Sequence, residues 1–341
     1  METGLSWLRQ LAQAEPGFQF LLLTDKKALP SFPENVLVQE LPSFGSFFAL
    51  KTRWSLRKRI KEWIPAILVT VSDGFTFQTN CPQIVVFSDT AFLPKSQLRV
   101  LSKKVSLVSA TIFPSRATAS YWQPLLKIKT KNIHVILPPP FLAGKPLNAA
   151  EKMQCQLEYT EGRQFFMLAE QLTSEELLIN VLKAFSLFKK RQQTNMKLVL
   201  PFAMTDTLQS FTNKLSSYKY REDVVVTGSV SEDIRARLAA TAYALLVVDP
   251  LGQTEACIME ALQLEQPILL PRTPKAEEVA GPSALYTDPD NFQDLADKMM
   301  LLYKDEDLRA NLISQGKKQY VHLSGEAAIE RFRQLLRSSA S

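Results

Sequence analysis

The chain has 341 residues, of which 46% are hydrophobic, so it can bury one or two sizeable cores, and we expect two domains. No apolar run reaches the roughly 20 residues that span a bilayer, and the amino terminus lacks the layout of a signal peptide, which together predict a cytoplasmic protein. The three cysteines, Cys81, Cys155 and Cys257, have no metal-binding spacing, so we expect neither disulfides nor a metal site.

The formal net charge of +6 is concentrated in the first part of the chain. Residues 1–140 hold 17 Lys and Arg against 8 Asp and Glu, a balance of +9, whereas the remainder has a balance of −3. Within the basic part, residues 47–64 interleave tryptophan, leucine and isoleucine with lysine and arginine, which predicts an amphipathic helix. Such a helix could lie on an anionic membrane surface, making the protein peripheral, although we favour packing against a sheet. We expect no nucleic-acid partner.

In chain order, the first 140 residues alternate helical patterns with buried strands. A helix is predicted over residues 4–14, where leucines recur at helical spacing. Polar residues follow several of the strands, as is typical of parallel strands whose carboxyl ends face a ligand. His134 falls inside the last strand of this part, and we interpret it as structural. Strands are predicted over residues 18–24, 66–74, 83–93, 133–140 and within 105–118.

The same alternation continues from residue 163 to the end of the chain. Residues 247–270, VVDPLGQTEACIMEALQLEQPILL, predict a strand end, a loop, a short helix and a second buried strand. In an open parallel sheet, ligands bind at the carboxyl ends of strands, where a loop leads into a helix amino terminus with unpaired N–H groups. We therefore place the candidate site in this stretch.

This stretch, with residues 274–289 after it, resembles the donor-sugar site of the family 4 glycosyltransferases, the glycosyl transferases group 1. The resemblance implies the α/β GT-B fold, in which two Rossmann-like domains face a cleft and a C-terminal helix crosses back to the first domain. It places the acceptor-side domain at 1–138, a linker at 139–163, the donor-side domain at 164–321 and the crossover helix at 322–341. The matching residues are Glu260, Ala261, Pro267, Glu278, Val279, Ala280, Gly281, Ala284 and Leu285.

Part of a nucleotide-binding site is retained under this resemblance. It implies that Glu260 binds the ribose hydroxyls of a nucleotide, although a glutamate in the first turns of a helix also stabilises the helix dipole. Gly228 and Ser229 would hold the base through backbone contacts, but a glycine needed only for a turn explains the sequence equally well. The first glutamate of the family's pair, which would bind the transferred sugar, is Gly252 here.

Other positions depart from the family pattern. The histidine of a His-Asp pair is Ser88, followed by Asp89, and the Gly-Phe-Gly loop is Gln253-Thr254-Glu255. Thr254 is a candidate N-cap, and Glu255 would place a carboxylate where a phosphate would dock. The family's diphosphate-binding lysine and arginine correspond to Glu176 and Gln171. Exchanging a lysine for a glutamate roughly 4 to 5 Å from a diphosphate changes the interaction by a few kcal/mol at an effective dielectric near ~20.

Two functions follow from these patterns. The resemblance implies an enzyme that transfers a sugar from a nucleotide diphosphate sugar, without a further cofactor, to a glycan or lipid-linked acceptor, as in cell-surface polysaccharide synthesis. The departures favour loss or heavy modification of that activity, because stabilising the leaving diphosphate is mainly electrostatic work. The second hypothesis is therefore a pseudo-glycosyltransferase that binds a partner protein or a glycan without turnover.

Overall fold

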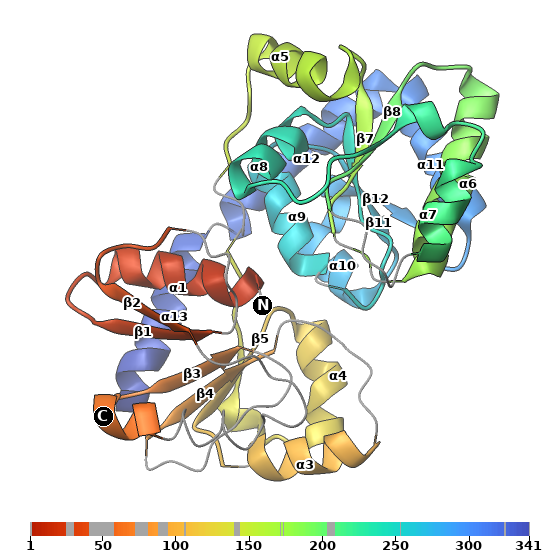
Figure 1. The fold of residues 1–341 in the computed structure, drawn as a ribbon. Helices are drawn as coiled ribbons and strands as arrows, with labels where there is room; N and C mark the ends of the chain where they lie inside the picture. The colour runs from red at the N-terminus through yellow and green to blue at the C-terminus, as the bar shows by residue number, and fades with distance from the viewer. Residues whose placement is uncertain are drawn as a thin grey trace.

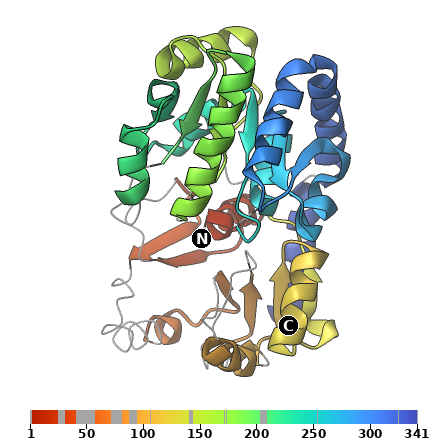
Figure 2. The same cartoon turned by 90° about the vertical axis from the view of Figure 1, so that its right-hand side faces the viewer.

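The computed structural model contains two α/β halves, one above the other (Figures 1 and 2). Every strand pairing is parallel among the described residues. The predicted α/β architecture is therefore confirmed. The structure describes residues 2–24, 31–40, 58–71, 81–87, 95–105, 107–139, 144–170, 172, 174–202, 209–252, 254–323 and 325–340.

The first half holds a two-stranded sheet and a four-stranded sheet of order β3-β4-β5-β6. Alternate residues along its strands point to opposite faces of the sheet. Ile84 and Ile112 pack toward α1, whereas Val85 and Phe113 pack toward α3 and α4. Its elements are α1 (Glu2–Ala14), β1 (Phe20–Thr24), β2 (Val36–Glu40), β3 (Leu68–Val71), β4 (Gln83–Val86), α3 (Lys95–Val105), β5 (Ala110–Phe113), α4 (Arg116–Leu126), η1 (Thr130–Asn132) and β6 (Ile133–Val135).

The second half is a six-stranded sheet of order β12-β11-β10-β7-β8-β9, covered by helices on both faces. Its elements are α5 (Ala149–Thr160), β7 (Phe165–Leu168), α6 (Glu175–Gln192), β8 (Lys197–Leu200), α7 (Gln209–Ser216), η3 (Arg221–Asp223), β9 (Val224–Val226), α8 (Glu232–Thr241), β10 (Ala244–Leu246), α9 (Thr254–Gln263), β11 (Ile268–Pro271), α10 (Pro274–Ala280), η4 (Gly281–Ser283), β12 (Ala284–Thr287), α11 (Phe292–Lys304) and α12 (Glu306–Leu323).

The apolar strands of this sheet are buried on both faces, which explains their continuous hydrophobic runs. Phe165 and Leu245 face the core formed with α8 and α9, while Phe166 and Leu246 face the core formed with α6 and α11. Successive strands are added toward one edge of the sheet from β7 to β9, and toward the other edge from β10 to β12. The order thus reverses between β7 and β10, which lie side by side.

The last helix, α13 (Gly325–Ala340), returns to the first half, as the resemblance implied. Phe332 on this helix is fully buried and meets Trp7 of α1 edge to face, with ring centroids 4.9 Å apart. Glu15, just after α1, accepts hydrogen bonds from Arg333 at 2.6 Å and Arg337 at 3.0 Å. The core of the first half is therefore completed by the end of the chain.

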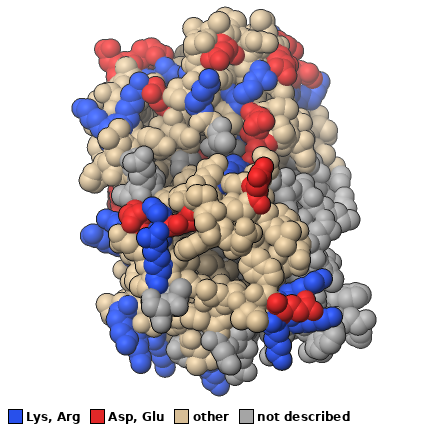
Figure 3. Space-filling model, turned by 90° about the vertical axis from the view of Figure 1, so that its left-hand side faces the viewer, with Lys and Arg blue, Asp and Glu red and all other residues tan. Residues whose placement is uncertain are grey.

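Across the part of the chain that the structure describes, none of the helices has the length and hydropathy needed to cross a bilayer. Figure 3 shows lysine and arginine side chains gathered over the lower end of one face, which belongs to the first half. Of the basic segment 47–64, only the helical residues 58–63 and Ile64 are described. There Lys58 and Arg59 lie 3.7 and 3.4 Å from the carboxylate of Glu62.

Candidate functional site

The reversal of strand order between β7 and β10 defines where a ligand would bind in this sheet. Loops that follow the two strands diverge to opposite faces, and the crevice between them is the usual ligand site of open α/β sheets. Glu170 follows β7 and points across this crevice. Its Oε1 accepts hydrogen bonds from the backbone amides of Val248 at 2.7 Å and Asp249 at 2.9 Å, just after β10. A carboxylate therefore occupies the crevice.

The surroundings of Glu170 change its acidity. Burial raises the pKa of its carboxyl group to about 7, and the nearby carboxylate of Asp249 acts in the same direction. The two amide hydrogen bonds and the ammonium of Lys275 oppose this rise in pKa. Glu170 therefore exchanges its proton near neutral pH, and above that pH it contributes a negative charge to the crevice.

Gly252 lies against the same side chain. A Cβ atom built on Gly252 would be only 2.9 Å from Oε2 of Glu170 and 3.3 Å from Cβ of Asp249. Real Cβ atoms essentially never come this close to another heavy atom, so a glutamate at this position would require Glu170 to move. A side chain at position 252 and the carboxylate of Glu170 would thus compete for the same space.

A buried lysine lies beside this loop. Lys275, in the first turn of α10, is only 4% exposed, and its Nζ donates a 2.6 Å hydrogen bond to the backbone carbonyl of Gly252. Its ammonium holds the loop that follows β10 against the start of α10. Sequence reasoning missed both Lys275 and the role of Glu170. For Glu170, the sequence offered one signal, which is an acidic residue directly after a central buried strand. For Lys275 the sequence offered no such signal.

The start of α9 differs from the sequence expectation in one respect. Thr254 is the first residue of the helix, and its buried hydroxyl has no hydrogen-bond partner among the described residues. The prediction that Thr254 caps α9 is therefore wrong, because the helix begins at this residue rather than after it.

Glu255 leaves the start of α9 and reaches the other half of the molecule. The residue is 1% exposed, and its Oε1 accepts hydrogen bonds from Ser115 Oγ at 2.9 Å and Thr118 Oγ1 at 2.8 Å. Its second oxygen, Oε2, is buried and has no partner among the described residues. The carboxylate of Glu255 thus lies at the junction of the two halves.

Glu260 is also engaged within the protein. It is 4% exposed, and its Oε2 lies 3.7 Å from Nη2 of Arg235 on α8. The same guanidinium donates a 3.0 Å hydrogen bond to the carbonyl of Ala169, at the end of β7. Arg235 therefore joins Glu260 to the strand that ends in Glu170, and a ribose would have to share Glu260 with this cation.

The remaining predicted site residues lie in different surroundings. Gly228, after β9, has a φ of +73°, and no atom lies within 4 Å of a Cβ built there, so the glycine is explained by its left-handed turn. Ser229 beside it is exposed. Glu176 is exposed in the first turn of α6, where it favours the helix dipole. The predictions for Ser88, Asp89 and Gln171, and for Gln253 in the loop, concern positions outside the described residues.

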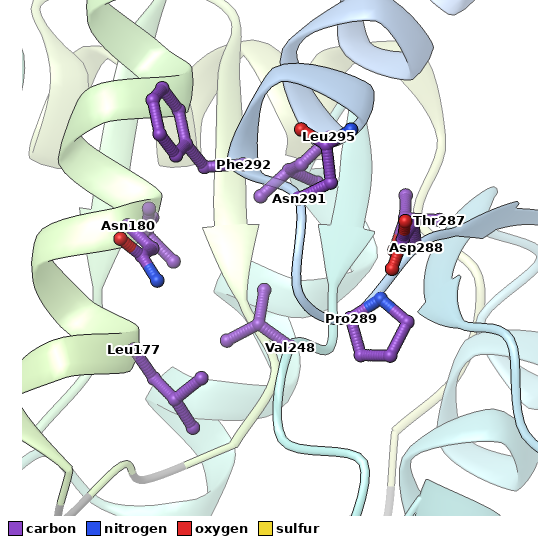
Figure 4. Close-up of a pocket in the computed structure, with 10 residues that line it drawn as sticks. Leu177, Asn180, Val248, Thr287, Asp288, Pro289, Asn291, Phe292 and Leu295 are labelled. Carbon is purple, nitrogen blue, oxygen red and sulfur yellow. The ribbon is translucent and has the colours of Figure 1, made fainter.

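A small pocket lies at the same edge of the sheet, between α6 and α11 (Figure 4). Its volume is about 20 Å³, which is room for about one water molecule. Val248 lines it, and the backbone amide of this residue is one of the two that donate to Glu170. The other lining residues are Leu177, Asn180, Val181, Thr287, Asp288, Pro289, Asn291, Phe292 and Leu295.

In the described part of the chain, no group of three or more His, Cys, Asp or Glu is arranged to hold a metal.

Two α/β halves with a C-terminal helix that crosses back to the first half are the arrangement of the GT-B class of proteins. Residues 150–319 match the family model described as glycosyl transferases group 1, so the second half is a domain of that family, as predicted. No curated protein sequence matches the chain.

Solved structures share the whole fold. The glycosyltransferase from Rickettsia africae ESF-5 is 15% identical, with a TM-score of 0.74 over 99% of this chain and 94% of that one. Alr3699/HepE of Anabaena, in complex with UDP and glucose, is 13% identical, with a TM-score of 0.74 over 98% and 96%. Sucrose-phosphate synthase (tll1590) from Thermosynechococcus elongatus is 14% identical, with a TM-score of 0.77 over 97% and 92%. The GT-B fold is thus confirmed over nearly the full chain.

Proposed function

We propose that this protein is a pseudo-glycosyltransferase, which keeps the two-half fold and its cleft but does not transfer sugar from a nucleotide diphosphate donor. The observation that carries the proposal is the carboxylate of Glu170 in the switch-point crevice, bonded to the amides of Val248 and Asp249. Backbone amides at such strand ends are the groups that otherwise bind phosphate oxygens. In this protein they already have an anionic partner.

The electrostatic cost for a diphosphate follows from Coulomb's law. Two unit charges 4 Å apart interact by about 4 kcal/mol at an effective dielectric of about 20, which is about a thousandfold in affinity. Glu255 adds a second buried carboxylate at the start of α9. Lys275 and Arg235 are bonded to protein carbonyls, and Arg235 also pairs with Glu260, so their charge offsets these glutamates rather than a ligand. A neutral glycan or a partner protein avoids this repulsion.

One observation favours the alternative, an active glycosyltransferase using a nucleotide diphosphate sugar and a glycan or lipid-linked acceptor. The ammonium of Lys275 lies next to the crevice, on the carbonyl of Gly252. If it rotated toward a bound diphosphate it would neutralise part of the negative charge. HepE, which has the same fold, is seen with UDP and glucose.

Calorimetric titration at pH 8, where Glu170 is ionised, separates the two functions. The ligands are UDP, GDP, ADP and UDP-glucose, combined with an assay for UDP released from UDP-glucose. We expect neither saturable micromolar binding nor release of UDP. Micromolar binding with turnover would establish the transferase and overturn the proposal.

Two variants test the cause. Glu170→Gln removes the charge from the crevice, and we expect it to bind UDP measurably more tightly than the wild type. Glu222→Gln is the matched control, since it removes an exposed glutamate just before β9, at the opposite end of the sheet from the crevice. An equal gain in both variants would show that overall charge, and not the crevice carboxylate, sets the affinity for nucleotides.

A further inference from the structure

The first turn of α4 is bound by carboxylates from the opposite half of the molecule. The backbone amides of Arg116 and Ala117 donate hydrogen bonds, each 2.9 Å long, to Oε1 and Oε2 of Glu278 on α10. These amides have no acceptor within their own helix, and the positive end of the helix dipole favours an anion there. Figure 1 shows α10 at the lower edge of the second half, next to α4.

A second carboxylate binds the side chains of the same turn. Ser115 caps α4 by accepting a hydrogen bond from the amide of Thr118. The hydroxyls of Ser115 and Thr118 both donate to Glu255 of α9. Two amides and two hydroxyls at the start of one helix are thus held by two glutamates of the other half.

We propose that Glu255 and Glu278 form a clasp that holds the two halves of the protein closed without any ligand. Hydrogen bonds to charged groups are stronger than those between neutral groups, and the contacts of Glu255 are buried whereas those of Glu278 are exposed to solvent. Two domains joined by a linker otherwise move relative to one another. In most proteins with a cleft between domains, the ligand supplies the closing contacts. Here side chains of the protein supply such contacts, so a ligand that needs the two halves further apart must break the clasp.

The contacts of Glu255 in the clasp hold the two halves together only weakly. Glu255 is buried with Oε2 unpartnered among the described residues, and such a group gains hydration when it is exposed to water. Breaking the two hydroxyl contacts therefore costs less than their number implies. An ion pair among the described residues also joins the halves, but Arg9 of α1 and Glu232 of α8, which lie 3.0 Å apart, are not part of the clasp.

Hydrogen exchange combined with small-angle X-ray scattering tests this proposal on the full chain without ligand. In Glu278→Gln, we expect the amides of Arg116 and Ala117 to exchange at least about tenfold faster, which corresponds to losing one charge-assisted hydrogen bond. The radius of gyration should increase at the same time. Thr118→Val, which keeps the side-chain shape and removes one hydroxyl donor to Glu255, should increase it as well, and the double variant should increase it most.

The matched control is Glu277→Gln, on the same helix, because Glu277 is half-exposed and pairs with Arg272 within its own half. It should leave both measurements unchanged. Far-UV circular dichroism and the melting temperature show whether each variant is folded. A folded double variant whose radius of gyration and exchange at Arg116 and Ala117 equal those of the control would overturn the clasp.

Discussion

Glu170 and Val248 lie at the ends of neighbouring strands, and a 2.7 Å hydrogen bond joins the carboxylate of the first to the backbone amide of the second. This bond spans the point at which the sheet reverses its strand order. The crevice that would receive phosphate oxygens in a nucleotide-binding sheet is thereby closed by a side chain of the protein. Several consequences can be measured on the protein alone.

The stability of the protein should fall as pH rises toward neutrality because of Glu170. Its pKa is raised from 4.5 to about 7, so the folded state binds this proton more tightly than the unfolded state. The contribution of Glu170 to the free energy of unfolding is fully present below pH 4.5 and is lost as pH rises through 7. The total loss is about 3 kcal/mol. Urea unfolding at pH 5 and pH 8 should show this loss in the wild type and a smaller one in Glu170→Gln. If the free energy of unfolding changed equally with pH in the two proteins, Glu170 would not be the cause of the loss.

Gly252 and Glu170 should be energetically coupled. In Gly252→Ala the new Cβ would lie 2.9 Å from Oε2 of Glu170, and because this atom is the far end of a flexible side chain that can shift, we expect a loss of less than about 1 kcal/mol. Truncating the neighbour in Gly252→Ala/Glu170→Ala should recover part of that loss. Denaturant unfolding of the wild type, both single variants and the double variant gives the coupling energy. Simple additivity would mean that the two side chains do not compete for space.

Lys275→Met should destabilise the loop that follows β10. The carbonyl of Gly252 loses its donor, and the buried stem is replaced by an apolar chain of similar length, so we expect a loss of about 1 to 2 kcal/mol. The pKa of Glu170 should rise further, because the ammonium of Lys275 lowers it in the wild type. Lys275→Arg, which keeps the charge, is the control for that shift. Carbon-detected NMR titration of Glu170 measures the pKa in each variant.

Acid should loosen α13. The hydrogen bond from Arg333 is the main reason why the pKa of Glu15 is lowered below 4.5, with charge and hydrogen-bond contributions from Arg337 as well. Its contribution to stability is present above pH 4.5 and is lost as pH falls through the lowered pKa. The protection factors of the α13 amides, which correct for the slower intrinsic exchange in acid, should therefore fall as pH is lowered in the wild type. In Glu15→Gln these protection factors should be low already at pH 7, and equal protection in the two proteins would contradict this role.

Much of the fold could be predicted from the sequence because the evidence for it is local. Continuous apolar runs marked many of the buried strands, and within residues 247–270 the predicted helix and the strand after it are present, although the preceding strand ends at Leu246. The docking of α13 on the first half followed from the resemblance to a known fold, and Phe332 against Trp7 shows its physical basis. These features depend on periodicity and composition, which a single sequence contains.

The site could be predicted only in part, because its contacts join distant positions. Glu255 was expected near a phosphate position, but its partner Thr118 is 137 residues away and in the other half. The contacts of Glu170 with Val248 span 78 residues. Thr254 was assigned as a cap from residue type alone, and a helix that starts one residue earlier than expected removes that role. Tertiary geometry of this kind leaves no periodic trace in the sequence.

The return of α13 has a consequence for biosynthesis. Glu15 is bonded to Arg337, 322 positions later, and Phe332 fills the core beneath α1. Domains generally fold as they emerge from the ribosome, starting at the amino terminus. In this protein, the first half is made before the second, yet it lacks a piece of its own interior until α13 has been made. A nascent chain stalled before residue 325 would therefore expose the apolar face of α1. We expect chaperones to bind this exposed face.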